Sequence, residues 1–510
     1  MKLFKYIQHI CAKAATALAL CLFAILIVSG LFATARLGKQ NWSHEAIVFI
    51  YDGFVPNLLL TVLMLGAILL LYKLLERFSG VKLSTAMLGS WCIGTLVLVV
   101  GANVVQMYDF AYVLEGAQLF AHGNYKPMTI DYFNACSHQL GICLPMEIIQ
   151  RILPELNLSL FMQLVNVFFS AGIAGILSVL SSILFSHKEA KAAVLLYVLF
   201  LPLALQCIFV YSTLPMLFLV SAAMLSLTLY LQKRKLRFGH VYALCISVAC
   251  MLKPNAVIPL LAMIICALLD TLTSHDAKLL GCVILSALLA FALQKLVVLQ
   301  YELRAGVTLT GDVSMLARFV MGLQRGGAEA GWYTRYIEQF FPFEVTNAQE
   351  YAIASADLSA RLAEMKADPL MALSFFKDKL LSQWLEPSYG ALWYGDLCEH
   401  AGPLAAVSKA LFADSGVIRS SLEYVMGIYQ KVLYLLIGIG LTGMLFEKKP
   451  CLAALMLPVC ALGGCLYHMI FEAKAQYMYP YVLLMIPVAA HGLCMIGSKA
   501  FSVLHIRNCK

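Results

Sequence analysis

The acidic residue Asp109 is the first position at which this sequence suggests chemistry. It follows a long apolar run almost directly, in the segment Gln106-Met107-Tyr108-Asp109-Phe110, so that a carboxylate stands at the edge of a hydrophobic segment. A carboxylate in that position either marks the end of a helix and contacts water, or it takes part in proton transfer. Its position alone leaves both interpretations open.

The residues that follow Asp109 favour a functional role for it. An amphipathic stretch from Ala111 to His122 precedes Gly123-Asn124-Tyr125, then Asp131-Tyr132-Phe133, then His138-Gln139-Leu140-Gly141. Aromatic and hydrogen-bonding side chains are therefore concentrated behind one acid. A histidine such as His138 either contacts a substrate or satisfies a backbone carbonyl, and the sequence leaves both roles open.

Three further polar patches interrupt apolar runs later in the chain. They are Tyr211-Ser212-Thr213-Leu214-Pro215, Leu252-Lys253-Pro254-Asn255, and Phe471-Glu472-Ala473-Lys474-Ala475-Gln476-Tyr477. Each patch is a weak signal when taken separately. Glu472 either orients Lys474 or only pairs with it near lipid headgroups.

In this order, the four patches resemble the GT-C membrane glycosyltransferases, in the branch that is similar to protein O-mannosyltransferases. The resemblance extends over most of residues 84 to 498. It implies transfer of a sugar from a polyprenyl-phosphate carrier to a hydroxyl acceptor on the extracytoplasmic face, with inversion at the anomeric carbon. The acceptor is a glycan, a lipid or a protein, and the sequence does not distinguish these.

The resemblance also implies roles for individual residues. Asp109 is expected to be the general base, and Asp131 a second catalytic acid or, with Asp109, a ligand for a divalent cation such as Mg²⁺ or Mn²⁺. Lys253 and Lys474 are expected to meet the carrier phosphate as point charges. The other expected substrate-binding residues are His138, Gln139, Glu472 and Tyr477.

Two positions depart from the pattern of that family. Many relatives have two adjacent acids in the first loop, but Phe110 follows Asp109 here, which weakens the expectation of a metal. Many have an arginine before the tyrosine of the last patch, where this chain has Gln476. Lys474 is expected to substitute for it, without the two-pronged geometry of a guanidinium.

The elements that position these residues are membrane helices. The 510 residues are 62% hydrophobic and only 13% charged, whereas soluble domains carry about 25% charged residues. The basic residues that give a net charge of +8 lie in short clusters between apolar runs, which indicates membrane topology and not nucleic-acid binding. The sixteen cysteines show no metal-binding spacing, and Cys136 with Cys143 is the one pair considered for a disulfide.

Twelve apolar runs predict an all-helical polytopic membrane protein with both termini in the cytoplasm, in a bacterial plasma membrane. The first run follows Lys2, Lys5 and Lys13 and is too long for a signal peptide, so an uncleaved helix is expected. Lysine and arginine concentrate in the predicted inner connections, including Lys448, Lys449 and Lys510. The predicted spans lie at about 14–35, 48–72, 84–106, 158–185, 192–209, 213–231, 239–252, 255–273, 279–300, 425–446, 451–470 and 479–498.

Two long segments outside the membrane divide the chain. Residues 1 to 300 are expected to form a membrane module that contains a first catalytic loop at about 108 to 157, residues 301 to 424 an extracytoplasmic region, and residues 425 to 510 the last helices. Residues 241 to 269 are expected to form a helical pair that turns at Lys253-Pro254, because proline disfavours a continuous helix. Trp384 and Trp393 are expected at the membrane interface.

Two other functions use similar residues. A transporter or flippase for a lipid-linked saccharide would place polar groups near the bilayer midplane, often in two repeated halves, and no such repeat is evident. A polysaccharide polymerase or ligase would use the same carrier lipid and transfer a chain. The expected partners are therefore a polyprenyl-phosphate-linked donor, the acceptor and membrane lipids, without nucleic acid.

Overall fold

The computed structural model describes residues 2–41, 44–77, 80–129, 131–309, 311, 313–326, 328–340, 345–448 and 451–507. Within these ranges, Asp131, a few other residues and those from 499 onward are described by their backbone only. The predicted inner charges Lys449 and Lys510 lie outside the described residues.

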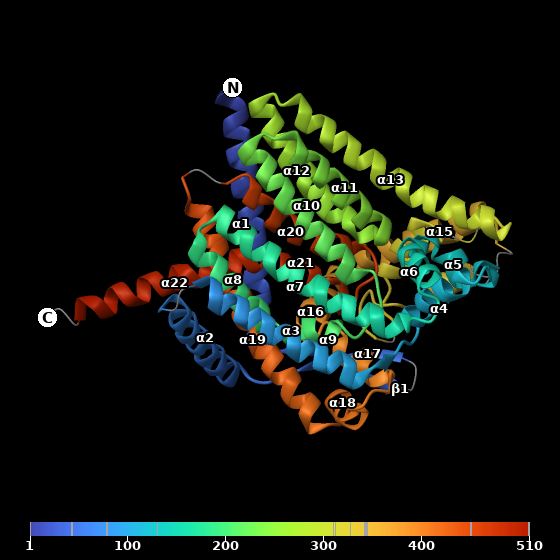
Figure 1. Cartoon of the computed structure of the whole chain (residues 1–510), viewed down its shortest axis with the longest axis horizontal. Helices are drawn as coiled ribbons and strands as arrows, with labels where there is room; N and C mark the ends of the chain where they lie inside the picture. The colour runs from blue at the N-terminus through green and yellow to red at the C-terminus, as the bar shows by residue number, and fades with distance from the viewer. Residues whose placement is uncertain are drawn as a thin grey trace.

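A bundle of long helices forms the body of the molecule (Figure 1). Within the described ranges, nine helices are long and apolar enough to cross a membrane, and a tenth span is formed if one bent pair is counted together. The predicted all-helical polytopic fold is confirmed, whereas the count of twelve spans is not. The main helices of the bundle are α1 (Lys2–Phe32), α2 (Phe54–Arg77), α3 (Gly80–Ala102), α7 (Leu158–Leu184), α10 (Thr213–Lys233), α11 (Leu236–Leu252), α12 (Val257–Ser274), α13 (Ala277–Ala305), α19 (Val417–Phe446), α20 (Met456–Ile470) and α22 (Ile486–Arg507).

Two of the predicted spans are broken by proline. The span expected at 192–209 consists of α8 (His187–Val198) and α9 (Leu201–Gln206), and Pro202 stands in the first turn of α9. The last span consists of α21 (Tyr479–Leu484) and α22, which meet at an angle of 55°. Pro487 follows the start of α22. Proline lacks a backbone donor and clashes with the preceding turn, so each apolar run is interrupted where proline occurs.

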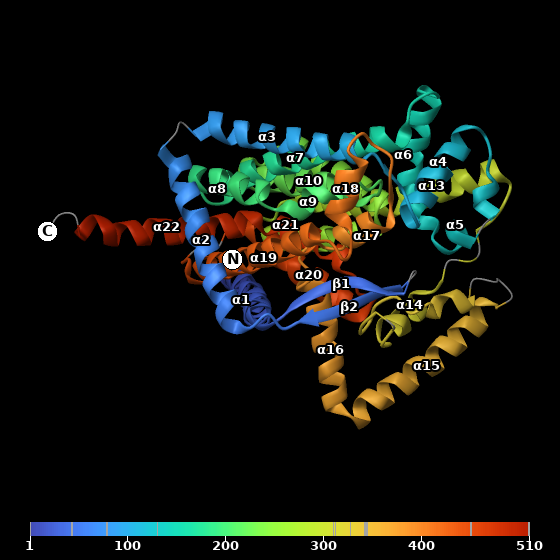
Figure 2. The ribbon, with the colours of Figure 1, turned by 90° about the horizontal axis from the view of Figure 1, so that it is seen from below.

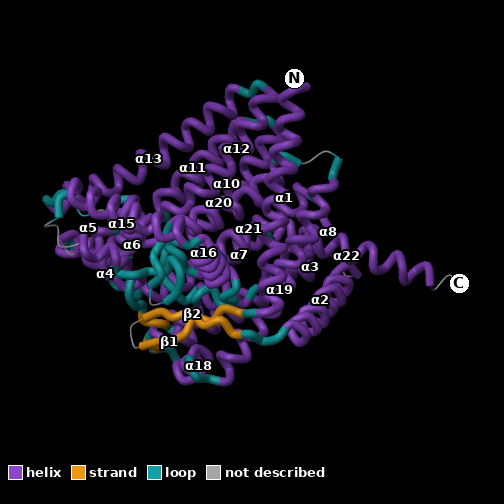
Figure 3. The backbone as a smooth tube through the Cα atoms, turned by 180° about the vertical axis from the view of Figure 1, so that it is seen from behind, coloured by secondary structure: helices purple, strands orange, loops and turns teal. Residues whose placement is uncertain are grey.

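A β-hairpin replaces the predicted ends of the first two spans. Strands β1 (Thr34–Asn41) and β2 (His44–Ile50) pair antiparallel and lie beside the end of the bundle (Figure 3). Ala35 and Leu37 are buried in alternation with more polar residues, the period expected for a strand with one covered face. A second small ladder joins β3 (Val104–Val105) to β4 (Glu399–His400).

Ion pairs show which connections share an end of the bundle. Lys188 in the first turn of α8 lies 3.6 Å from Glu76 at the end of α2. Arg234, between α10 and α11, pairs with Asp270 at the end of α12 at 2.5 Å. Residues 234 and 270 can meet only if α11 and α12 run in opposite directions, so the predicted helical pair with its turn at Lys253 is confirmed.

The two long segments lie at the opposite end, which we call the site end (Figures 1 and 2). The first contains α4 (Asp109–Ala121), α5 (Asp131–Ala135) and α6 (Leu140–Ile152), with the 3₁₀ turns η1 (Lys126–Thr129) and η2 (Ser137–Gln139). The second contains α14 (Met315–Gly322), η4 (Tyr336–Phe340), α15 (Asn347–Ala367), α16 (Pro369–Trp384), α17 (Ala391–Leu397) and α18 (Ala405–Phe412). Short 3₁₀ turns η3 (Pro254–Ala256), η5 (Ala453–Leu455) and η6 (Ala475–Tyr477) precede α12, α20 and α21.

The second segment enters the bundle and does not merely cover it. Trp384 and Trp393 are 1% and 2% exposed, so the expectation that they lie at the membrane interface is wrong. The Trp384 ring meets the edge of Phe23 in α1 with their centroids 6.1 Å apart, and the Tyr434 hydroxyl of α19 donates to the Trp384 carbonyl at 2.6 Å. Contacts from two distant helices thus hold this tryptophan inside.

Buried Glu147 fastens the first segment to α13. Its carboxylate accepts hydrogen bonds from Tyr301 at 2.5 Å and from Arg151 at 2.8 Å, and it also pairs with Arg304. Arg304 in turn donates to the Tyr125 hydroxyl at 2.8 Å. The side chain of Glu147 is only 2% exposed, so each oxygen needs these partners.

We therefore expect Glu147→Gln to destabilise the protein by roughly 3 kcal/mol, because two arginines lose their buried counter-charge. Thermal unfolding of the purified protein measures the loss. Glu155→Gln, at an exposed position in the same segment, is the matched control and should leave the midpoint unchanged. Equal midpoints for the two variants would contradict the role given to Glu147.

The predicted sidedness can be tested at Asn347, an exposed residue at the start of α15. If residues 301 to 424 lie outside, a membrane-impermeant thiol reagent should label Asn347→Cys in intact cells. Lys448→Cys, exposed at the other end of the bundle, should be labelled only after the membrane is permeabilised. The reverse pattern would overturn the predicted orientation.

Candidate functional site

Asp109 is the first residue of α4, where the chain turns after β3. The turn is made by Tyr108, whose φ of 52° is positive. A carboxylate at the first turn of a helix is also favoured by the helix dipole. The local sequence therefore fixes where this acid stands.

Protein surrounds Asp109 on most sides, but its side chain remains accessible to solvent. Burial raises the pKa of Asp109, against the opposing effect of the nearby ammonium groups of Lys474 and Lys253. A raised pKa makes the carboxylate a stronger base at neutral pH. The hydroxyl of Tyr132, which lies beside Asp109, is buried and has no well-aligned hydrogen-bond partner among the described residues.

Lys474 lies between two other carboxylates. Its Nζ is 3.4 Å from Glu45 Oε1 and 3.9 Å from Glu472 Oε1. Burial alone would lower the pKa of Lys474, but Glu45 and Glu472 hold it well above its usual value. Tyr394 of α17 donates to Glu45 at 3.0 Å and fixes that carboxylate. Lys474 is therefore a firmly charged ammonium.

Glu45 was not found from the sequence. It lies in β2, within a stretch that was read as a short outer connection followed by a second span. The hairpin brings it to the end of the bundle, where it pairs with a residue more than four hundred positions away. The only sign of this role in the sequence is the alternation of side chains with period 2 along the strand that contains Glu45. A pattern over so few residues is not specific.

Lys253 stands at the turn between α11 and η3. Its Nζ donates to Thr213 Oγ1 at 2.9 Å and lies 4.4 Å from the centroid of the Tyr211 ring. Burial lowers the pKa of Lys253 to about 7, with Asp109 acting in the opposite direction. Unlike Lys474, it forms no ion pair within the described part of the chain.

His138 and Gln139 also lie on the first segment. Gln139 donates to the Tyr211 hydroxyl at 2.5 Å, which connects the segment to the start of α10. Burial, together with Arg318 and Lys253, lowers the pKa of His138 to about 3, so its imidazole is neutral at pH 7. Arg318 of α14, which the sequence did not single out, donates to the Ala135 carbonyl at 3.1 Å.

Gly141 explains how α6 comes close to Lys253. A Cβ at this position would lie 1.8 Å from the Met251 carbonyl oxygen at the end of α11. Only glycine allows the two backbones to approach so closely. The His138-Gln139-Leu140-Gly141 patch is thus both a set of polar side chains and a contact with the helix that carries Lys253.

The turn that carries Glu472 and Lys474 is held from both sides. His468 donates a hydrogen bond from Nδ1 to the Glu472 carbonyl at 3.0 Å, and its ring stacks on Tyr477 with centroids 4.9 Å apart. The buried ammonium of Lys379 in α16 donates to the Phe471 carbonyl at 2.7 Å. This turn therefore depends on the second segment for its position.

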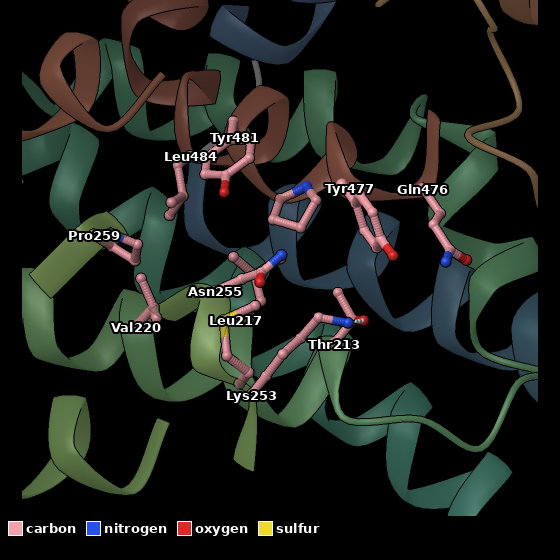
Figure 4. A pocket seen from close by; sticks show the side chains of 12 residues that line it. Thr213, Leu217, Val220, Lys253, Asn255, Pro259, Gln476, Tyr477, Tyr481 and Leu484 are labelled. Atoms are coloured by element: carbon pink, nitrogen blue, oxygen red, sulfur yellow. Dashed lines mark hydrogen bonds between the residues drawn. The ribbon is translucent and has the colours of Figure 1, made fainter. Parts of the chain in front are cut away.

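A cavity extends from Lys253 into the bundle (Figure 4). It holds about 360 Å³ of empty space including its opening. Thr213, Lys253 and Gln476 give it a polar end, and the rest of its wall is largely apolar, formed by residues such as Leu217 and Leu484. A second cavity of about 290 Å³, lined by Phe110 and Tyr211, shares Thr213 and Gln476 with the first.

Asp131 begins α5, and its side chain lies outside what the structure describes. Within the described residues, no group of three or more histidine, cysteine, aspartate and glutamate side chains is arranged to hold a metal. Beside Asp109, the place between Glu45 and Glu472 is taken by the Lys474 ammonium. The divalent cation stays a prediction. Cys136 and Cys143 do not form a disulfide with each other.

Comparisons with known proteins give a likeness in fold only. No protein-family model and no curated protein matches the sequence. One similar solved structure is the Archaeoglobus fulgidus oligosaccharyltransferase tethered to an acceptor peptide with the NVT sequon, at 12% identity and a TM-score of 0.42, over 83% of this chain and 51% of that chain. Another is AglB from the same organism with an inhibitory peptide and a dolichol-phosphate, at 11% identity and a TM-score of 0.42, over 86% and 52%. This chain spans about half the length of those proteins, and neither its site nor its substrate follows from the likeness.

Proposed function

We propose that this protein is an inverting membrane glycosyltransferase that transfers a sugar from a polyprenyl-phosphate carrier to a hydroxyl acceptor on the extracytoplasmic face. The observation that carries the proposal is an accessible carboxylate, Asp109, with the ammonium groups of Lys253 and Lys474 close enough that both lower its pKa. An apolar cavity begins at Lys253. Base, phosphate ligand and lipid site are the three features that such a reaction requires.

The donor lipid occupies the cavity with its phosphate at Lys253. The apolar wall suits a hydrocarbon chain, and the polar end suits a phosphate. Lys474 is already paired with Glu45 and Glu472, so Lys253 has more charge available for an incoming anion. The Lys474 ammonium stabilises the charge that grows on the leaving phosphate oxygen as the glycosidic bond breaks.

The acceptor hydroxyl approaches from the water side of Asp109. As its oxygen forms a bond to the anomeric carbon, its proton passes to the Asp109 carboxylate, and the carbon–oxygen bond to the phosphate breaks with its electron pair staying on the phosphate. Attack opposite the leaving group inverts the anomeric centre. The Tyr132 hydroxyl lies beside the Asp109 carboxylate and donates toward it, which helps to hold the base in place.

A transporter or flippase for the same lipid is the rival function. Transporters hold their substrate near the bilayer midplane, on broken helices of two related halves. Here the charged side chains gather at the site end of the bundle, which favours chemistry over transport. A polymerase or ligase would share the donor site and differ in its acceptor.

An assay with purified protein distinguishes these functions. The protein is given a radiolabelled polyprenyl-phosphate sugar as donor and an envelope extract as the source of acceptor. A glycosyltransferase releases polyprenyl phosphate and forms a labelled product. Movement of the intact donor across liposomes, without release of the phosphate, would overturn the proposal.

Asp109→Asn keeps the shape of the side chain and removes the proton acceptor. We expect turnover to fall by about 100-fold or more, while binding of the carrier lipid changes little. Asp131→Asn should have a smaller effect, unless the two acids share a metal. In that case the two losses should be alike, and a chelator should reproduce them. Near-normal turnover of folded Asp109→Asn protein would remove this residue from the mechanism.

The pKa of Lys253 gives a prediction on pH. The ammonium is charged below about pH 7 and neutral above it, so phosphate binding should weaken as the pH rises through this value. Polyprenyl phosphate should bind Lys253→Met about tenfold more weakly at pH 6, the loss of one charge-assisted contact. Lys253→Arg, which stays charged, should bind without the pH dependence. Binding of polyprenyl phosphate to the wild type and to each variant is measured from about pH 6 to about pH 9. A wild-type profile identical to that of Lys253→Arg would contradict the role of Lys253.

A further inference from the structure

The corner where α18 meets α19 is attached to the end of a membrane helix. We call residues 402 to 418 the α18 corner; it comprises α18, the following turn and the first residues of α19. The backbone of Gly402 donates to the Ala102 carbonyl at 2.9 Å, and that of Leu404 to the Gly101 carbonyl at 2.8 Å. Ala102 is the last residue of α3, so the corner continues directly from that helix.

Helix α3 presents its side chains to lipid. It is among the candidate spans, with only 17% of its apolar window buried inside the protein. Ile93, Val97 and Val100 are 65%, 54% and 44% exposed. An apolar face on a helix long enough to cross a membrane is suited to hydrocarbon, and it runs along α3 up to the α18 corner.

Helix α18 exposes an aliphatic side chain and buries a polar one at adjacent positions. Ser408 points inward, where its Oγ lies 2.6 Å from His400 Nδ1, and it is 4% exposed. Val407 points outward and is 63% exposed, and the neighbouring Ala406 and Ala410 are exposed as well. A helix on a water-facing surface turns its polar residues outward, so the pattern at 407 and 408 is the opposite of the one that water favours, whereas Phe412 is buried and Lys409 is exposed.

The start of α19 shows a similar pattern. Arg419 is completely buried, where it pairs with Asp414 at 3.0 Å and Glu423 at 3.2 Å and donates to the Leu37 carbonyl at 2.9 Å. Val417 and Ile418, just before it, are 82% and 52% exposed. Water would favour the arginine outside and the aliphatic residues inside.

We propose that the α18 corner is embedded in the surface of the bilayer at the site end, with membrane lipid as its partner. Leu404, Val407, Val417 and Ile418 lie at the boundary of headgroups and acyl chains, and the exposed Lys409 at the margin reaches lipid phosphate. Lipid is the occupant because the corner continues the lipid-facing surface of α3. The chain thus returns to the membrane near residue 402, before the predicted tenth span begins at 425.

The α18 corner also packs against a helix that contributes to the candidate site. The ring of Phe412 in α18 packs against Gly395 of α17, where a Cβ would lie 2.2 Å from it. Helix α17 carries Tyr394, which holds Glu45. Lipid on the outer side of α18 therefore supports the wall of the candidate site from behind.

The full-length protein in nanodiscs of phosphatidylethanolamine and phosphatidylglycerol tests the proposal. A nitroxide is attached through a ketone-bearing amino acid, because sixteen native cysteines would compete for a thiol reagent. It replaces the side chain of Val407 and, in a second sample, that of Val417. The lipid control is Leu288 on α13, which is 63% exposed, and the water control is the exposed Ser359 on α15.

Collision of the nitroxide with oxygen and with a water-soluble nickel complex then distinguishes the surroundings. We expect both corner positions to resemble Leu288, with oxygen collisions exceeding nickel collisions. Nickel collisions at the level of Ser359 would show water and overturn the proposal. Low collision with both reagents would show a protein cover, such as a second copy of the chain, and would overturn it as well.

The unmodified protein gives an independent measurement if a labelled variant fails to fold. A phospholipid that carries a diazirine at the start of its acyl chain should, on illumination, modify the peptide that contains residues 403 to 418 and leave α15 unmodified. Absence of the modification there, with α3 modified as a positive control, would contradict the proposal.

Discussion

Charge balance in poorly hydrated surroundings is the constraint on which the candidate site depends. A carboxylate such as Asp109 can remain ionised among apolar walls only if cations lie close to it. Lys474 and Lys253 meet this need, but a lysine in the same surroundings needs carboxylates of its own. Glu45 and Glu472 hold Lys474, while Lys253 has the Thr213 hydroxyl and the faces of Tyr211 and Tyr477. Of these two lysines, Lys253 forms no ion pair within the described residues and stands at the mouth of the cavity, where we propose that a phosphate binds.

This balance explains why segments from the whole chain meet at one end of the bundle. Glu45 comes from a hairpin, Asp109 from the first long segment, and Lys474 from the turn before the last helices. Each is fixed through backbone contacts and not through its charge alone. Gly141 lets the first segment touch the end of α11, and the Ala473 amide donates to the Gly331 carbonyl at 2.8 Å.

The two long segments contact two different environments, water and the interior of the bundle. At the end of α15, the charged residues Glu364 and Lys366 are exposed. Where the second segment meets the bundle, as at Trp384 and Arg419, large and even charged side chains are buried with partners. The α18 corner is a third case, because it exposes Leu404, Val407, Val417 and Ile418, while Ser408 and the adjacent Arg419 face inward. The division of such a chain into membrane and loop segments is therefore less sharp than its hydropathy suggests.

The sequence by itself determined the features that depend on neighbours along the chain. Apolar length predicted most of the helices, proline predicted the turn at Lys253, and the contrast between an apolar run and one acid identified Asp109. Only the tertiary structure decided that 34 to 50 form a hairpin, that Glu45 and Arg318 join the site, and that Trp384 is buried. Hydropathy and proline determine the extent of a single helix, so their effect can be predicted from a short stretch of sequence. Partners of a buried charge are selected in space, across hundreds of residues, so they become visible only when the helices have packed.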